Sequence, residues 1–254
     1  MPQSATITSK SALDTLNNHV SIRKYTDQDI DQSLLEALLN AARRSPTSSN
    51  MQTYSMVVVR DPEKKAKLSE YAGNQQHVKD CPVFVALCAD VSRMKQAAEL
   101  HGSSLGQNLE NSMVAIVDAA IVGMSLTTAA ESVGLGAVMI GAMRNHPAEV
   151  ADLLNLPKGA FVVYGLCLGW PDGEQIPPQK PRLPEDLVIH YESYDQSDTV
   201  DKLKQHDDEL AAHYNSLNRN LNSAAWTGIV ADKFSEPRRT FLREVLTDLG
   251  MSFE

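Results

Sequence analysis

Hydrophobic positions along the chain fall either at helical spacing or in short unbroken runs. From residue 30 to residue 42 they recur every three or four positions, which predicts a helix with Asp29 as its N-cap. Pro46 should end this helix, because the residue before a proline is pushed out of the helical region. Further helices are predicted over 62–71, over 148–154, from residue 200 through Leu203, Leu210 and Tyr214, and over 234–249.

Four apolar runs predict β-strands. They cover residues 56–60, 83–89, 137–140 and 161–168, and the first of them should form a short buried strand. The run at 83–89 lacks polar alternation, which is typical of a strand in the middle of its sheet. Most connections between the runs are long enough to hold a helix, so the pattern favours a layered α/β or α+β fold.

The strongest predicted helix covers residues 105–133. Its apolar residues occupy more than one face, so it should be buried on most sides, in a large core or partly in a subunit interface. Polar residues such as Asp118 and Glu131 interrupt it, which indicates a core helix rather than a membrane span. Gly134 and Gly136 should end it.

A proline-rich connector follows the last predicted strand, over residues 171–184. The helices beyond it resemble an arm more than a second domain with a core of its own. We therefore expect a single domain over residues 1–254, in which residues 171–254 form the connector and a helical C-terminal extension.

Composition and charge exclude several classes of protein. The 254 residues are 43% hydrophobic and 22% charged, as in an ordinary globular protein, and the net charge is −9. An acidic chain without a basic patch argues against nucleic acid as a partner. Three cysteines with no paired spacing argue against a disulfide framework, and the polar segment 1–10 shows no secretory signal. The cytoplasm is therefore the expected location, with no membrane partner.

The usual nucleophile, phosphate-loop and metal motifs are missing from the sequence. His77 and Cys81 stand four residues apart and could share a metal ion, but no third ligand lies nearby. We expect a surface histidine beside a buried thiol, and no metal site.

Two small groups of cationic and polar residues suggest a bound phosphate ester. His19, Ser21 and Arg23 alternate, and alternate side chains share one face of an extended segment. Lys180 and Arg182 flank a stiff proline in the same way. Taken alone, such charged residues in a loop are more often solvated than bound to a ligand.

From His19 to Thr26 the sequence resembles the opening motif of the FMN-dependent nitroreductase family, in its branch of oxygen-insensitive NADPH nitroreductases and NAD(P)H:flavin oxidoreductases. The resemblance continues in order through residues 47–49, 51–52, 72–75, 130–136, 140–145, 165–171 and 180–184. It implies an α+β nitroreductase fold, in which helices flank a central, mostly antiparallel sheet. It also implies a domain-swapped homodimer with FMN at the subunit interface.

The same resemblance implies which residues bind the cofactor. His19, Ser21, Lys180 and Arg182 match ligands of the FMN phosphate, and Arg23 matches a cation beside N1 and O2 of the flavin. The remaining matches are Thr47, Ser48 and Ser49 at the ribityl chain and ring edge across the dimer, Gln75 at the pyrimidine edge, and Ile140, Gly141 and Ala142 along the ring, where the Gly141 amide would donate to N5. Val20 and Ala142 depart from the common Arg and Gly of the family, which could shift substrate preference.

The implied reaction is a ping-pong transfer of two electrons from NADPH or NADH to nitroaromatics, quinones, flavins or similar acceptors. It needs no catalytic side chain, because the flavin carries the redox chemistry. A modest preference for NADPH would come from Arg238 and Arg219, with Arg239 and Arg144 as further nucleotide-binding candidates. The family's usual arginine position holds Leu217 here, but the loop over residues 218–222 could swing Arg219 inward. The alternative function is an FMN-binding sensor or reservoir without turnover.

Overall fold

The computed structural model describes residues 9–106, 108–219 and 225–254, and the chain divides into two compact units. The sheet unit comprises residues 1–177 and 241–254. The helical unit comprises residues 178–240, so it begins inside the expected proline-rich connector. That these units belong to one domain stays a prediction.

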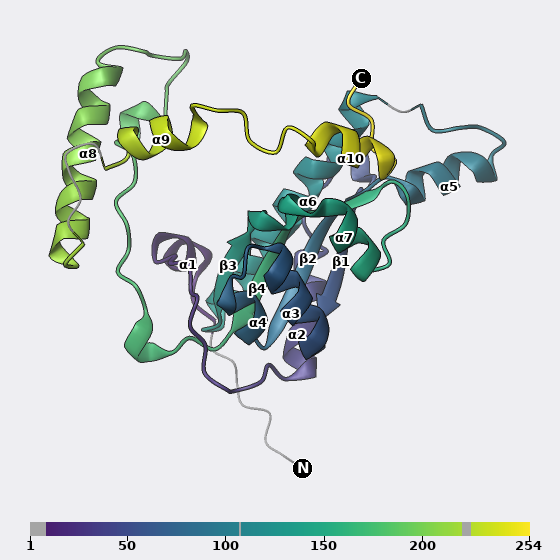
Figure 1. Ribbon diagram of the computed structural model, residues 1–254, viewed down its shortest axis with the longest axis horizontal. Helices are drawn as coiled ribbons and strands as arrows, with labels where there is room; N and C mark the ends of the chain where they lie inside the picture. Colours follow the sequence, from purple (N-terminus) through teal and green to yellow (C-terminus); the bar gives the residue numbers. More distant parts are fainter. Residues whose placement is uncertain (1–8, 107, 220–224) are drawn as a thin grey trace. The chain divides into compact units, whose positions relative to one another are not determined.

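The sheet unit is built on four antiparallel strands in the order β1-β2-β4-β3 (Figure 1). Their bounds are β1 (Tyr54–Val59), β2 (Val83–Asp90), β3 (Gly136–Ile140) and β4 (Ala160–Gly169). Every residue of β2 and β4 is buried, which confirms the central position expected for the run at 83–89. The first strand was expected to be buried, but it is half-exposed because it forms one edge of the sheet.

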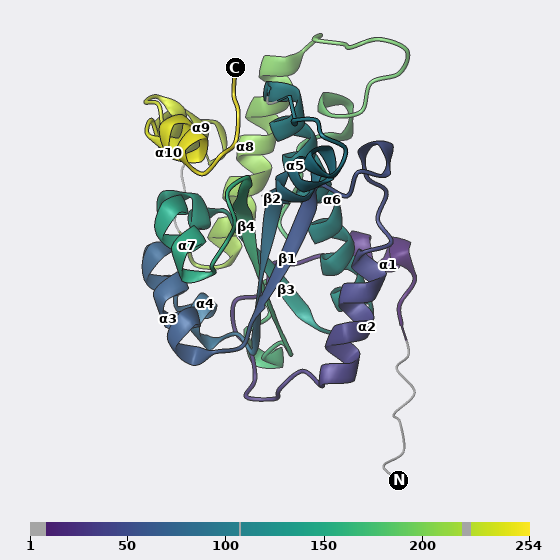
Figure 2. The same cartoon turned by 90° about the vertical axis from the view of Figure 1, so that its right-hand side faces the viewer.

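Helices cover both faces of the sheet, so the fold is α+β, as expected. Figure 2 shows the sheet between α2 and α6 on one side and α3, α4 and α7 on the other, and a separate apolar core fills each side. The helices of this unit are α1 (Ala12–Asn17), α2 (Gln32–Ala42), α3 (Pro62–Tyr71), α4 (Gln76–Asp80), α5 (Ser92–Leu100), α6 (Leu109–Ser132), α7 (Pro147–Leu153) and α10 (Leu242–Asp248).

Some predicted helix ends were wrong. Helix α2 begins at Gln32 with Asp31 as its N-cap, because the Asp31 carboxylate accepts hydrogen bonds from the Ser33 and Leu34 amides. Asp29 was the expected cap, but its carboxylate instead pairs with Arg60, 2.6 Å from the guanidinium. The short polar helices α1, α4 and α5 were not predicted.

Helix α6 crosses one face of the sheet and contacts α2 and β2. It begins at Leu109 rather than at residue 105, because Asn108 caps it by accepting from the Asn111 amide. By length and composition alone α6 could cross a membrane, yet 44% of its most apolar window is buried inside this protein. Packing against α2 and the sheet identifies it as a core helix.

The helical unit contains α8 (Thr199–Ser216) and α9 (Thr227–Phe234) around a small interior of Leu210, Ala211 and Ala225. The single helix predicted over 234–249 is wrong. Helix α9 ends at Phe234 and α10 begins at Leu242. Pro237 lies between them, and proline disfavours the helical conformation in the residue before it.

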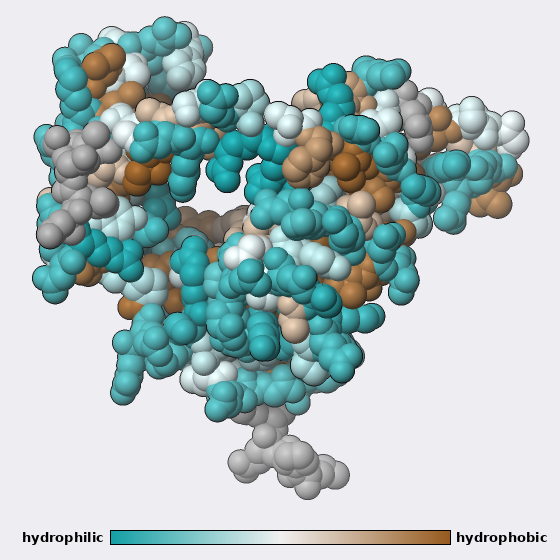
Figure 3. Space-filling model, in the orientation of Figure 1, coloured by the Kyte–Doolittle hydropathy of each residue, from teal (hydrophilic) through white to brown (hydrophobic). Residues whose placement is uncertain are grey.

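All three cysteines are free and buried, as the absence of a disulfide framework predicted. Burial raises the pKa of the Cys88 thiol to about 12, and the charge of Asp90 acts in the same direction. Cys88 therefore stays protonated and unreactive at neutral pH. Hydrophilic side chains cover most of the surface seen in Figure 3, with smaller hydrophobic patches between them.

Candidate functional site

The segment that carries His19, Ser21 and Arg23 runs along the β3 edge of the sheet. Ser21 pairs in parallel with Ala137, and the Ile22 amide donates to the Ala137 carbonyl at 2.9 Å. Ile22 is buried, whereas Ser21 is half-buried and Arg23 is exposed. A Cβ at Gly136 would lie 2.6 Å from the Ile22 Cβ, so this glycine leaves room for the segment.

The same edge of the sheet leads to Gly141. Strand β3 ends at Ile140, and the 3₁₀ helix η2 (Gly141–Asn145) follows it. Because residues 21–22 run parallel to β3, the chain brings the segment 19–23 and the residues 140–142 to one sheet edge. A Cβ at Gly141 would lie 3.3 Å from Arg144, so a glycine suits this crowded position.

Arg144 contacts the sheet. Its guanidinium donates to the Val163 carbonyl of β4, and Arg144 is half-buried. Its expected role in nucleotide binding stays a prediction, and this anchored position would leave only part of the guanidinium for a ligand.

His19 forms an ion pair that the sequence reasoning missed. Its Nδ1 lies 2.7 Å from Oε1 of Glu131, near the end of α6. Burial raises the pKa of Glu131 above its usual value, although His19 acts to lower it. The carboxylate fixes the orientation of the imidazole, much as outer carboxylates orient metal-binding histidines. The only sequence signal was an acidic residue inside the motif at 130–136.

Gln75 lies in the turn between α3 and α4. Gly73 and Asn74 adopt φ values of 78° and 60°. The side-chain amide of Gln75 donates through Nε2 to the Ala72 carbonyl at 2.9 Å. Burial lowers the pKa of His77, and the charge of Arg23 acts in the same direction. Within the described part of the chain the His77 Nε2 atom is buried without a hydrogen-bond partner. His77 is half-buried, not the surface histidine that was expected.

Thr47, Ser48 and Ser49 belong to a loop between α2 and β1. Ser48 and Ser49 are exposed, and the Ser48 amide donates to the Asp118 carboxylate at 3.0 Å. The loop therefore presents its hydroxyl groups on the surface while its backbone is held from inside.

Lys180 and Arg182 lie in the helical unit and line one cavity of about 680 Å³ there. Lys180 Nζ is 5.9 Å from the centre of the Tyr214 ring, a distance suited to a cation–π contact. The Arg182 guanidinium donates to the Lys180 carbonyl at 3.3 Å. That the two cations act together, and that they meet His19 and Ser21 at one phosphate, stays a prediction.

The other three arginines expected to bind the nucleotide, Arg219, Arg238 and Arg239, belong to the helical unit. Arg219 and Arg238 are exposed, and the Arg219 amide donates to the Tyr214 carbonyl at 3.0 Å, just after α8. Arg239 adopts a φ of 51°. The loop 218–222, expected to swing Arg219 inward, lies partly outside the described residues. Across the described ranges, no group of three metal-binding side chains comes together.

Two family models match the chain in succession. The model of the nitroreductase family matches residues 16–170, and that of the nitroreductase family's C-terminal domain matches residues 180–254. Among curated proteins, an FMN reductase [NAD(P)H] of Bacillus subtilis is 36% identical over 94% of this chain and 97% of its own. An oxygen-insensitive NADPH nitroreductase of Salmonella typhimurium is 35% identical over 94% of this chain and 97% of its own.

Solved structures give the same result. NfrA2 of Bacillus megaterium superposes with a TM-score of 0.91 at 38% identity, covering 96% of this chain and 98% of its own. The NADPH:FMN oxidoreductase of Vibrio harveyi, solved with NAD⁺, has a TM-score of 0.86 at 32% identity over 96% of this chain and 99% of its own. With two family models covering nearly the whole sequence and relatives above 30% identity, the chain belongs to the nitroreductase family.

Proposed function

We propose that this FMN-dependent oxidoreductase transfers two electrons from NAD(P)H in a ping-pong reaction to nitroaromatics, quinones, flavins or similar acceptors. The observation that carries the proposal is the β3 edge, where the segment 19–23 runs parallel to the strand that leads into Gly141. Family membership and the activities of the relatives make the chain an NAD(P)H-dependent oxidoreductase that uses FMN.

The residues present fit FMN chemically. A phosphate monoester suits an imidazole paired with a carboxylate, a hydroxyl and cations, which His19, Ser21, Lys180 and Arg182 supply. A flavin ring suits a close backbone approach at Gly141 and a cation at Arg23. The Nε2 atom of His77, on α4, is buried and has no hydrogen-bond partner in the described chain, so it is available to a bound ligand.

When bound, FMN would supply the redox chemistry that links the nicotinamide donor to the acceptor. The side chains of the protein would position FMN and set the electric field around its ring. Arg23, exposed beside the β3 edge, would stabilise negative charge on the reduced ring. His19, held by Glu131, would bind the phosphate, and no acid or base is assigned among the side chains.

A homodimer accounts for an apolar stripe on α6. Leu109, Met113, Val117 and Met124 recur on one face of the helix and are 36–52% exposed. We propose that a second copy covers this stripe and that the enzyme works in the cytoplasm. Val117→Glu places a charge at the centre of the stripe and should yield a monomer by analytical ultracentrifugation. A stable dimer in this variant would place the interface elsewhere.

The phosphate assignment is tested by FMN retention. Lys180→Ala and Arg182→Ala should each weaken FMN binding by about tenfold or more, because a charge-assisted hydrogen bond contributes about 1.5–3 kcal/mol. Lys204→Ala is the matched control, since Lys204 is an exposed lysine of the same unit that pairs with Asp201. Full flavin occupancy in the first two variants would contradict the assignment.

Turnover is tested by anaerobic stopped-flow spectroscopy. Mixing the FMN-loaded protein with NADPH or NADH should bleach the flavin absorption within seconds, and adding a quinone or nitroaromatic should restore it. A loaded protein that neither nucleotide bleaches would instead be the FMN-binding sensor or reservoir.

A further inference from the structure

A buried carboxylate stands in the middle of the apolar helix α6. Asp118 is 1% exposed, and within the described chain its hydrogen-bond donors, Ser48 and Thr53, both come from the loop before β1. It accepts from the Ser48 amide at 3.0 Å, the Thr53 amide at 3.1 Å and the Thr53 hydroxyl at 2.7 Å. A buried carboxylate is tolerated only when such donors replace water, so helix and loop depend on each other.

The segment between these two anchor points has an unusual backbone. Ser49, Asn50 and Gln52 adopt φ values of 46°, 56° and 54°, which side-chain-bearing residues adopt at a cost in energy. Residues 48–52 are all exposed, whereas Thr53 is 1% exposed. Because Ser48 and Thr53 bind one carboxylate, the two ends of the loop are drawn together and its tip is held outward.

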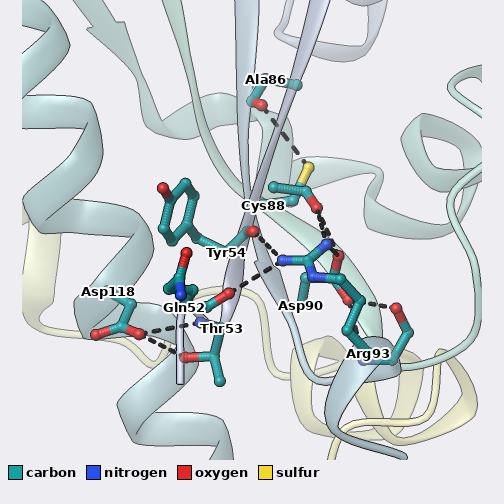
Figure 4. Close-up of polar contacts among 10 residues, drawn as sticks. Gln52, Thr53, Tyr54, Ala86, Cys88, Asp90, Arg93 and Asp118 are labelled. Atoms are coloured by element: carbon teal, nitrogen blue, oxygen red, sulfur yellow. Dashed lines mark hydrogen bonds and ion pairs between the residues drawn. The ribbon is translucent and has the colours of Figure 1, made fainter. Parts of the chain in front are cut away.

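A second anchor acts from the opposite side of the loop. The Arg93 guanidinium donates to the Gln52 carbonyl at 3.0 Å and to the Tyr54 carbonyl, and it pairs with Asp90 at 2.8 Å. Figure 4 shows Asp118 on one side of residues 52–54 and Arg93 on the other. Arg93 binds the loop at Gln52 and Tyr54, near its strand end, whereas Asp118 also binds the other end of the loop at Ser48.

We propose that Asp118 is a positioning residue of the flavin site: it holds Ser48 and Thr53 so that the exposed tip presents its side chains to the ring edge. This inference rests on the proposed function, in which the 47–49 hydroxyls face the ribityl chain and ring edge. Asp118 itself is buried beneath the loop and acts only through the backbone and hydroxyl that it binds.

The test compares Asp118→Asn with Asp207→Asn. The replacement keeps the shape but puts a donor where an acceptor is needed. Asp207 is the matched control because it is also buried and also accepts from two amides and a threonine hydroxyl, those of Trp226 and Thr227 in the helical unit.

The first readout is hydrogen exchange of the FMN-free protein. In Asp118→Asn we expect the Ser48 and Thr53 amides to exchange about tenfold faster or more, while the core amides of β2 and β4 stay protected. Asp207→Asn should leave the amides of Ser48 and Thr53 at the wild-type rate. Wild-type exchange in Asp118→Asn, or equal acceleration by both variants, would overturn the anchoring.

The second readout is the loaded enzyme. Asp118→Asn should shift the visible absorption of the bound flavin and raise the KM of the acceptor about fivefold, with kcat changed less than about twofold, because a misplaced tip weakens binding more than chemistry. An unchanged spectrum and KM would overturn the positioning role.

A second variant, Thr53→Val, and FMN uptake by the wild-type protein complete the test. If Asp118→Asn does not fold, Thr53→Val removes only the hydroxyl donor and should change the same readouts in the same direction, and a wild-type result for it counts against the proposal. A wild-type protein that takes up no FMN would overturn the proposed function, while the exchange comparison would still decide the anchoring.

Discussion

The sheet unit and the helical unit differ in how much apolar surface each buries within itself. The sheet unit has an apolar core on each face of its sheet, built around strands whose residues are all buried. Among its described residues, the helical unit has a small apolar interior of Leu210, Ala211 and Ala225, with Tyr214 and Trp226 packed against them. Hydrophobic stabilisation scales with buried apolar area, so the sheet unit must supply most of the folding free energy.

Both units nevertheless contain a buried carboxylate with the same set of hydrogen-bond donors. Asp118 in the sheet unit and Asp207 in the helical unit each accept two amides and one threonine hydroxyl. Asp118 connects residues 65 and 70 positions away, whereas Asp207 connects residues 19 and 20 positions away. The contacts of Asp118 join elements that are far apart in the sequence, whereas those of Asp207 join α8 to the start of the next helix, α9.

The largest expected effect separates the two interiors. Leu166→Ala, in the fully buried strand β4, should lower the free energy of unfolding by about 4 kcal/mol, whereas Leu210→Ala should lower it by about 2 kcal/mol, because fewer neighbours surround it. Urea unfolding measures both, and Trp170 and Trp226 report on one unit each once the other is changed to phenylalanine. Equal costs would show that the two interiors are equivalent.

The next effect concerns the buried polar network of the sheet unit. Although burial acts to raise the pKa of Asp90, hydrogen bonds from Ser55 and Ser92 and the charge of Arg93 hold it below its usual value. A lowered pKa contributes stability above about pH 4 that is lost as the pH falls through the folded value.

Asp90→Asn should therefore cost about 2 kcal/mol at pH 6, and the difference from wild type should narrow toward pH 3. Urea titrations at both pH values measure it. Asp208→Asn, on the exposed side of α8, serves as the control and should stay within about 0.5 kcal/mol of wild type. A constant difference between the two pH values would mean that Asp90 titrates alike in the folded and unfolded chains.

A smaller effect concerns the midpoint potential of bound FMN, which we expect Arg23 of the sheet unit to raise. Arg23→Ala should lower the two-electron midpoint potential of bound FMN by about 30 mV or more, which corresponds to about 1.4 kcal/mol, because the cation favours the reduced ring. Spectroelectrochemical titration measures it. Arg43→Ala, at the end of α2, removes an arginine bonded to Asn40 and should leave the potential unchanged. A wild-type potential in Arg23→Ala would remove this role.

The smallest effect would assign nucleotide choice to the helical unit. Arg238→Ala should reduce kcat/KM for NADPH about threefold and leave the value for NADH unchanged, because an exposed charge pair contributes at most about 1 kcal/mol. The preference should also shrink as ionic strength rises. Arg243→Ala, an exposed arginine of α10, is the control. A wild-type enzyme that uses both nucleotides equally would show that these arginines do not bind the 2′-phosphate.

The elements that sequence predicted well are those whose local chemistry is sufficient. Helix α3 begins after Asp61, whose side chain caps it, and Pro62 occupies its first turn, so its bounds follow from local signals. Helices α1, α4 and α5 were missed because they are short and polar, with little apolar periodicity. The ordered family motifs gave the fold and the cofactor, while the residue roles at the flavin remain predictions.

The sequence by itself determined the α+β fold, the central position of the strand at 83–89 and the family, because unbroken apolar runs and ordered motifs are properties of the linear chain. Only the tertiary structure decided that Glu131 holds His19 and that Asp118 and Arg93 hold the loop before β1. A buried carboxylate in an apolar helix says that donors must exist, since its burial is costly without them. For Asp118 these donors lie 65 and 70 positions away in the sequence, and no local pattern encodes such contacts.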